Sequence, residues 1–262
     1  PPPPPPPFQA EDGIRDTRIG LVGSEMCIRD SVKTLHRPLR VREVKLEDGT
    51  TAYASDGAPS DCVALALLGF FEEPIHLVVS GINPYANLGH DVTYSGTVTA
   101  AMEAVIFGVP GIAFSLAGSD DHQHFHFETA ATAAASVIKT VLSQGLLPDL
   151  LLNVNVPNLS VDELCGYRVT RQGMRVYRAA LDRRLDPRDR PYYWIGGPMP
   201  EGIPDEGTDI GAIAEGYVSI TPLHLDLTEY RRAERLKQWH WQARELPSSN
   251  GRYSPALMAL HL

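Results

Sequence analysis

The sequence predicts an α/β fold built on a mainly parallel sheet, with a β-rich extension at its C-terminal end. Short apolar strands alternate with one-faced helices between about residues 63 and 156, a pattern typical of right-handed βαβ crossover units. After Gly166 the pattern changes, and short strands are predicted there. The 262 residues are 43 % hydrophobic and 21 % charged, so a core of useful size can form.

The net charge is −9, which argues against binding to nucleic acid or to an anionic membrane, because both require a basic surface. The three cysteines, Cys27, Cys62 and Cys165, are widely spaced and predict reduced thiols. The sequence has neither an apolar run near the ~20 residues of a membrane span nor a recognisable signal peptide. We therefore expect a cytoplasmic protein.

Residues 1–31 show neither a helical nor a strand period and begin with seven prolines. This stretch resembles the translation of a sequencing adapter, which predicts that it is foreign to the protein. The alternative is a natural disordered tail. In both cases we leave it out of the fold prediction and expect the genuine protein to begin near Val32 to Leu35.

The first predicted elements form a hairpin. Alternating residues favour a strand over 39–45, the Asp48-Gly49 pair predicts a tight turn, and a return strand follows over 50–54. Pro59 suits the first position of a helix. That helix is expected to run to about Phe70, with one buried face formed by Val63, Ala66, Leu67 and Phe70.

The next elements form the predicted parallel sheet. A strand over 76–80 leads into a polar loop over 81–93, and Ser95 is the candidate N-cap of a helix that ends near Gly108 and Pro110. Its predicted buried face holds five residues: Val98, Ala101, Met102, Val105 and Ile106. A strand over 111–116, a helix over 130–143 and a strand over 150–156 complete the pattern.

The C-terminal part predicts strands over 167–170, 192–195 and 217–220. The charged stretch 182–191 is interpreted either as an arm or hairpin reaching a neighbouring subunit or as a mobile surface loop. The tail over 229–262 is expected to be helical or disordered.

Small polar residues gather where the strand ending at Ser80 gives way to the helix at Ser95, a place where open parallel sheets bind ligands. They are Ser80, Asn83, Asn87, His90, Asp91, Ser95 and Thr97. The helix start favours an anion, and neutral oxygens suit magnesium or manganese. The composition thus predicts a phosphate cradle beside a cation, and the plainer interpretation is a capped helix with a polar loop.

Two other groups are weaker candidates. His122, His124 and His126 follow Asp120 and Asp121 and could bind a transition metal, although a solvated loop explains them as well. Asp209 and Glu215 could form a carboxylate pair, and the alternative is an ordinary polar helix face. No P-loop, Gly-x-Ser-x-Gly elbow or dinucleotide fingerprint is present.

The literal strings carry a more specific signal. Ser80-Gly81-Ile82-Asn83, Asn87-Leu88-Gly89 and Tyr94-Ser95-Gly96-Thr97-Val98 resemble the signature of the SurE family of 5′-nucleotidases. The family's other motifs are matched by Gly57 to Val63, Leu152 to Pro157 and Glu215 to Leu223. The resemblance runs from about Thr34 to about Thr228, which sets a predicted domain of 32–228, with 166–228 as its β-rich part.

The resemblance implies a Rossmann-like fold and hydrolysis of nucleoside 5′-monophosphates to nucleoside and phosphate with a bound divalent metal, Mg or Mn. It also implies a homodimer or homotetramer formed through exchanged C-terminal segments. Carried over by position, Asn83 would be a metal ligand. Asn87, Ser95, Gly96 and Thr97 would line the phosphate site.

One part of the family pattern is missing. The sequence has no Asn-Asp-Asp-Gly motif to supply the family's metal-binding aspartates. Asp12-Gly13 follows a glutamate, and Ser31 lies too close to Thr34 to be the family's metal serine. We therefore name no catalytic residue. We expect that the family's first strands are missing, that the sheet has an unpaired strand edge, and that hydrolysis is impaired. The alternative is a noncatalytic chain that binds nucleotides or oligomerises.

Overall fold

The computed structural model describes residues 20–23, 33–34, 37–118, 124–177, 180–196 and 201–241. The chain divides into one unit spanning Pro1–His224 and another spanning Leu225–Leu262. Asp12-Gly13, Ser31 and His122 lie outside the described residues. No helix of the described part is long and apolar enough to cross a membrane.

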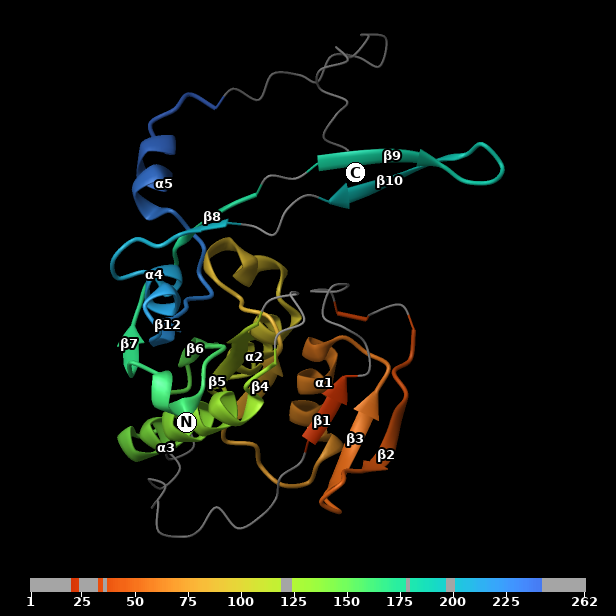
Figure 1. Cartoon of the computed structure of the whole chain (residues 1–262), viewed down its shortest axis with the longest axis vertical. Helices are drawn as coiled ribbons and strands as arrows, with labels where there is room; N and C mark the ends of the chain where they lie inside the picture. The colour runs from red at the N-terminus through yellow and green to blue at the C-terminus, as the bar shows by residue number, and fades with distance from the viewer. Residues whose placement is uncertain are drawn as a thin grey trace. The chain divides into compact units, whose positions relative to one another are not determined.

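A five-stranded sheet with the order β4-β5-β6-β12-β7 forms the centre of the larger unit (Figure 1). Its strands are β4 (Val78–Asn83), β5 (Gly111–Ala117), β6 (Leu151–Pro157), β12 (Val218–Pro222) and β7 (Tyr167–Val169). β4, β5 and β6 are parallel, β12 is antiparallel to β6, and β7 is parallel to β12. The predicted mainly parallel α/β sheet is therefore confirmed.

Each face of this sheet packs against a helix. Helix α3 (Phe127–Gln144) places Ala130, Ala133 and Val137 against the apolar face of β5 and β6, where Phe114 and Val154 are fully buried. Helix α2 (Gly96–Ile106) covers the other face with Val98 and Ala101, beside Ala113 and Leu151. Burying a side chain of the size of Val, Leu or Phe stabilises the fold by about 1.5–3 kcal/mol, so these two layers hold the sheet.

The buried face of α2 is predicted correctly except at its end. Val98 and Ala101 are fully buried, whereas Ile106 is 64 % exposed. The buried stripe continues through Ala104, and a residue two positions later is rotated by about 200° around the helix axis. Ile106 therefore points away from the sheet, and its assignment to the buried face was wrong.

The predicted hairpin is present as β2 (Val41–Lys45) and β3 (Thr51–Ser55), which pair in antiparallel fashion. At its turn, the Thr50 amide donates to the Asp48 carboxylate at 2.9 Å. Strand β1 (Gly20–Gly23) pairs in parallel with β3. It lies within residues 1–31, where no element was predicted.

The predicted helix over 59–70 is less regular than expected. It consists of α1 (Pro59–Leu65) and a π-helical turn, η1 (Ala66–Phe70). Gly69 has a φ of +105°, outside the helical region, and ends the regular turn. As a result Phe70 is 40 % exposed and contacts the rings of Tyr53 and Phe71 edge-on, so its expected place on the buried face was wrong.

The C-terminal part contains two further strand pairs. β9 (Ala180–Leu185) and β10 (Pro191–Gly196) form an antiparallel hairpin, so the charged stretch 182–191 is a hairpin and the loop alternative was wrong.

The remaining elements are short. β8 (Met174–Val176) pairs with β11 (Glu201–Ile203), and α4 (Asp209–Ala214) leads into β12. Short 3-10 turns cover η2 (Gly89–Tyr94) and η3 (Val161–Glu163). In the second unit, α5 (Tyr230–Leu236) is the helical part of the predicted tail.

Strand β4 is the edge of the five-stranded sheet. Among the described residues it pairs with β5 alone, and Val79 is 46 % exposed. Within the described part of the chain the outer edge of β4 is therefore unpaired, and the expected loss of the family's first strands stays a prediction.

Candidate phosphate-binding site

The candidate site lies at the carboxyl ends of β4, β5 and β6. Pairing brings Asn83 beside Ser115, and Ser115 beside Asn155, so three parallel strands present polar residues in one row. β4 continues through Asn83, three residues beyond the predicted strand end. Gly81 makes this possible, because a Cβ at that position would lie 2.2 Å from the Phe114 carbonyl oxygen. Its φ of +114° also disfavours any other residue.

Asn83 is half-buried at the end of β4. The side-chain nitrogen of Asn83 donates to the Tyr85 carbonyl oxygen at 2.6 Å. The side-chain oxygen is therefore the atom of Asn83 that suits a hard cation. Within the described parts of the chain, no three His, Cys, Asp or Glu side chains lie close enough together to hold a metal ion.

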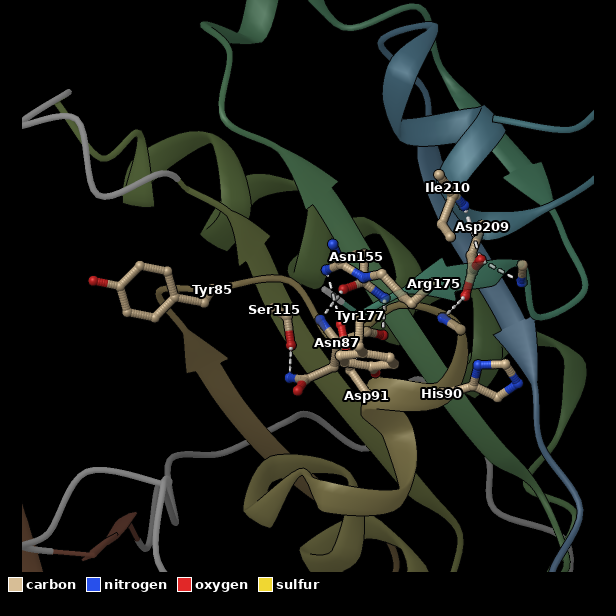
Figure 2. Close-up of polar contacts among 12 residues, drawn as sticks. Tyr85, Asn87, His90, Asp91, Ser115, Asn155, Arg175, Tyr177, Asp209 and Ile210 are labelled. Carbon is tan, nitrogen blue, oxygen red and sulfur yellow. Dashed lines mark hydrogen bonds and ion pairs between the residues drawn. The ribbon is translucent and has the colours of Figure 1, made fainter. Parts of the chain in front are cut away.

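Asn87 is held by an amide cluster, which we define as Asn87, Ser115, Asn153 and Asn155. Figure 2 labels Asn87, Ser115 and Asn155. The Asn87 amide N–H donates to the Asn155 side-chain oxygen at 2.8 Å, and the Asn87 side chain donates to the Ser115 hydroxyl at 2.7 Å. The Asn153 and Asn155 side chains both donate to the Asn87 carbonyl oxygen, at 2.8 and 3.1 Å. All four residues are buried. The sheet therefore fixes both the backbone and the side chain of Asn87.

Gly89, two residues later, is held from the C-terminal part of the chain. The Asp209 carboxylate accepts the Gly89 amide at 2.8 Å, the Gly173 amide at 2.7 Å and the Ile210 amide at 2.8 Å. The Gln172 side chain donates to the Gly89 carbonyl oxygen at 2.9 Å. Asp209 is fully buried at the first turn of α4. Its carboxylate joins two loops that are distant in sequence (Figure 2).

These contacts correct the interpretation of Asp209 and Glu215. Asp209 lies neither on an ordinary polar helix face nor in a carboxylate pair, because its two oxygens are taken up by backbone amides. Glu215 is exposed and forms an ion pair with Arg168 at 2.6 Å. Since a surface pair of this kind contributes about 0–1 kcal/mol, only Asp209 bears on the site.

A third contact holds the start of η2. The Arg175 guanidinium lies 2.8 Å from the Asp91 carboxylate, and the Tyr177 hydroxyl donates to the other carboxylate oxygen at 2.5 Å. Partial burial and this carboxylate raise the pKa of Tyr177 to about 12. The neighbouring His90 is exposed. Asp91 thus anchors β8 to the loop and is not presented to a ligand by itself.

The start of α2 is built as predicted. Ser95 caps the helix, because its hydroxyl accepts the Val98 amide at 3.1 Å. Gly96 and Thr97 form the first turn, where backbone amides and the helix dipole favour an anion. Ser95 and Thr97 are 6 % and 4 % exposed. Three of the four predicted phosphate residues, Ser95, Gly96 and Thr97, therefore lie at a buried helix start.

The histidine stretch is only partly described. The rings of His124 and His126 meet edge-on with centroids 5.0 Å apart. The Asn158 side chain accepts the His126 amide and donates to the His124 carbonyl oxygen. His122 and the two preceding aspartates are outside the described residues, so the metal interpretation of this stretch stays a prediction.

Sequence reasoning missed the residues that hold the loop. Asn153 and Asn155 alternate with apolar residues in a strand that is buried throughout, and buried asparagines need hydrogen-bond partners, so that pattern was a usable signal. Asp209 directly follows the N-cap Thr208. Its partners Gly89 and Gly173 are distant in sequence, and no local pattern indicates them.

Comparisons with known proteins concern the chain as a whole. The profile of the family described as Survival protein SurE matches residues 27–179. The chain is 50 % identical to the 5′-nucleotidase SurE of Chloroflexus aggregans over 210 residues, which cover 80 % of this chain and 83 % of the relative. Identity to the 5′-nucleotidase SurE of Herpetosiphon aurantiacus is 52 % over 214 residues, covering 80 % and 82 %. The crystal structure of the SurE protein from Aquifex aeolicus matches with a TM-score of 0.68 at 39 % identity, covering 83 % of this chain and 86 % of that one.

Proposed function

Because the chain belongs to the Survival protein SurE family, we propose that it is a 5′-nucleotidase chain that binds nucleoside 5′-monophosphates and releases phosphate from them. The observation that carries this proposal is the row of Asn83, Ser115 and Asn155 at the carboxyl ends of three parallel strands. Asn83 ends β4, and the loop that follows this strand leads to the start of α2, where an anion is favoured. Its relatives carry the name 5′-nucleotidase SurE.

We assign the phosphate group to Asn87, Ser95, Gly96 and Thr97. The first turn of α2 supplies oriented amides, and the amide cluster fixes Asn87 against β5 and β6. A fixed donor set stabilises a bound anion without the cost of ordering it on binding. In this arrangement the chain's own part in the reaction is to hold and orient the phosphoryl group.

The metal part of the proposal is only half supported by the residues present. Magnesium or manganese would polarise the phosphoryl group, and Asn83 would offer one neutral oxygen to it. The described residues include no carboxylate cluster to complete such a site, and the sequence has no Asn-Asp-Asp-Gly motif. The residues do not fit a complete metal site, so we propose that this chain binds nucleotide and turns it over poorly.

We also propose that residues 1–31 are foreign, that 32–228 form the nucleotidase domain, and that the chain works in the cytoplasm as a homodimer or homotetramer. The β9–β10 hairpin supports self-association, since Leu181, Trp194 and Ile195 are 67 %, 60 % and 84 % exposed. Exposed apolar side chains in one segment are typical of interaction surfaces. The exposed apolar side chains of the hairpin are equally compatible with the alternative, a noncatalytic chain that binds nucleotides and oligomerises.

The test replaces residues 1–31 with the N-terminal segment of the Chloroflexus relative. With manganese and adenosine 5′-monophosphate, we expect the parent chain to bind the nucleotide in calorimetry but release little phosphate. The chimera should release phosphate at least ~100-fold faster, and Asn83→Ala in the chimera should remove most of that gain. Rapid hydrolysis by the parent would refute the proposed impairment, and a chimera that binds without hydrolysis would favour the noncatalytic alternative.

A further inference from the structure

We propose that Asp209 is a positioning residue for the substrate loop, which we define as Asn87–Gly89. This inference rests on the proposed function, because it concerns the segment to which we assign the phosphate group. Asp209 itself does not face the ligand. It would act through the Gly89 backbone, whose amide it accepts at 2.8 Å.

Burial makes this carboxylate an unusually firm anchor. Asp209 is 0 % exposed, and a buried carboxylate is stable only when hydrogen bonds replace its water. One oxygen accepts the Gly89 amide, and the other accepts the amides of Gly173 and Ile210. Hydrogen bonds to a charged acceptor are stronger than those to a neutral one. Movement of the loop would therefore leave part of a buried charge unsatisfied.

The C-terminal part of the chain also holds Gly89 through a second hydrogen bond and a close backbone contact. The Gly89 carbonyl oxygen accepts the Gln172 side chain at 2.9 Å, so both polar groups of this residue are held by the C-terminal part. A Cβ at Gly89 would come within 2.6 Å of the Gly173 carbonyl oxygen. The two backbones are in direct contact, and Asp209 lies between them as their shared acceptor.

The substrate loop is therefore fixed at both of its ends by different parts of the chain. The amide cluster fixes Asn87 from the sheet, and Asp209 fixes Gly89 from α4. The substitution Asp209→Asn would leave a single acceptor oxygen at this position, and the new NH2 group would face one of the amide donors. Misplacement of a binding group by about 1 Å can cost ~100-fold in an enzyme reaction, so a small loop shift would be measurable.

The experiment compares the parent chain with Asp209→Asn, Gln172→Ala and Thr170→Val. Thr170 is a matched control, because it is buried and its hydroxyl bonds to Ser219 and Thr221 in the contacts described, and not to the loop. Calorimetry gives the Kd for adenosine 5′-monophosphate and for inorganic phosphate, each with manganese, at a temperature well below the Tm of every variant. Gln172→Ala removes a less buried contact and serves if Asp209→Asn does not fold.

We expect Asp209→Asn to raise both Kd values at least ~10-fold and Gln172→Ala to raise them about threefold, while Thr170→Val lowers the Tm and leaves both values within about twofold. Parent-like affinity in Asp209→Asn, or in Gln172→Ala if the first variant does not fold, would overturn the positioning role and leave the proposed function standing. An equal loss in Thr170→Val would reduce Asp209 to a stabilising residue. A parent chain that binds neither ligand would overturn the phosphate site and this inference together.

Discussion

Two clusters of buried polar side chains lie on the same face of the five-stranded sheet, and they do different work. The amide cluster on β5, β6 and the substrate loop bonds the backbone of Asn87. The hydroxyl cluster, defined as Thr170, Ser219 and Thr221, bonds only among its own hydroxyl groups in the contacts described, at 2.8–3.5 Å. Register pairs Asn155 directly with Ser219 and Asn153 with Thr221, so the clusters are neighbours in one polar layer.

The difference shows what ties a buried polar group to function. A hydroxyl can donate and accept with a neighbouring hydroxyl, so a hydroxyl cluster satisfies itself. An asparagine carries a donor and an acceptor at a fixed spacing, which matches the N–H and C=O of a peptide group. The amide cluster therefore orders a loop, whereas the hydroxyl cluster orders only the strands that carry it.

The largest effect is expected for Asn155→Ala compared with Ser219→Ala. The first change removes the acceptor of the Asn87 amide and one donor to its carbonyl oxygen. Leaving buried backbone groups unsatisfied costs about 1–3 kcal/mol each. We expect a loss of about 2–4 kcal/mol in the free energy of unfolding and at least ~10-fold weaker nucleotide binding. Urea unfolding and calorimetry measure these two quantities.

Ser219→Ala provides the comparison at the adjacent register position. It should destabilise the fold by about 1 kcal/mol with unchanged nucleotide affinity, because the Ser219 contacts do not include the loop. If both variants lose affinity in proportion to their stability, the distinction between the two clusters is wrong.

Local patterns in the sequence predict much of the fold and little of what holds the site. The strand and helix periods place β5, α3 and β6 to within a few residues, and the Ser95 cap is confirmed. These features depend on neighbours a few positions apart. The Asp209 contact spans 120 residues and the Asn87–Asn155 contact spans 68, so a single sequence carries no local signal for either.

Two errors in the fold prediction also come from contacts or geometry that a residue pattern does not show. β4 continues to Asn83 because its Gly81 lies against the Phe114 carbonyl oxygen of β5, a packing contact that composition does not reveal. Phe70 leaves the predicted buried face because Gly69 has a positive φ. Both differences follow from backbone geometry at a glycine, where a side-chain period has no information.

Ser95 extends the comparison of the two clusters to a third kind of buried polar group. Its hydroxyl accepts a backbone amide of a helix, whereas the amide cluster bonds the backbone of a loop. Ser95→Ala should cost about 1 kcal/mol, whereas Ser95→Gly should cost only a few tenths of that amount. If the hydroxyl also lines the phosphate site, both variants should lose phosphate affinity to a similar degree. Thermal unfolding and calorimetry separate the two effects, and affinity that follows the Tm would show that Ser95 is only a cap.

The smallest effect concerns Tyr177, which holds the substrate-loop side of η2 through Asp91 from outside both clusters. Its pKa is raised to about 12 in the folded protein, against about 10 for an unfolded tyrosine. The folded state therefore keeps the proton longer, and the stabilising contribution is complete below about pH 10 and disappears as the pH rises to about 12. Tyr177→Phe should unfold more easily below about pH 10 and should show a shallower decline between about pH 10 and 12. Tyr193→Phe, at a tyrosine that is 53 % exposed in β10, is the control and should leave this slope unchanged. A parent-like slope in Tyr177→Phe would mean that the hydroxyl contact to Asp91 does not contribute to stability, and that η2 is anchored to β8 by Arg175 alone.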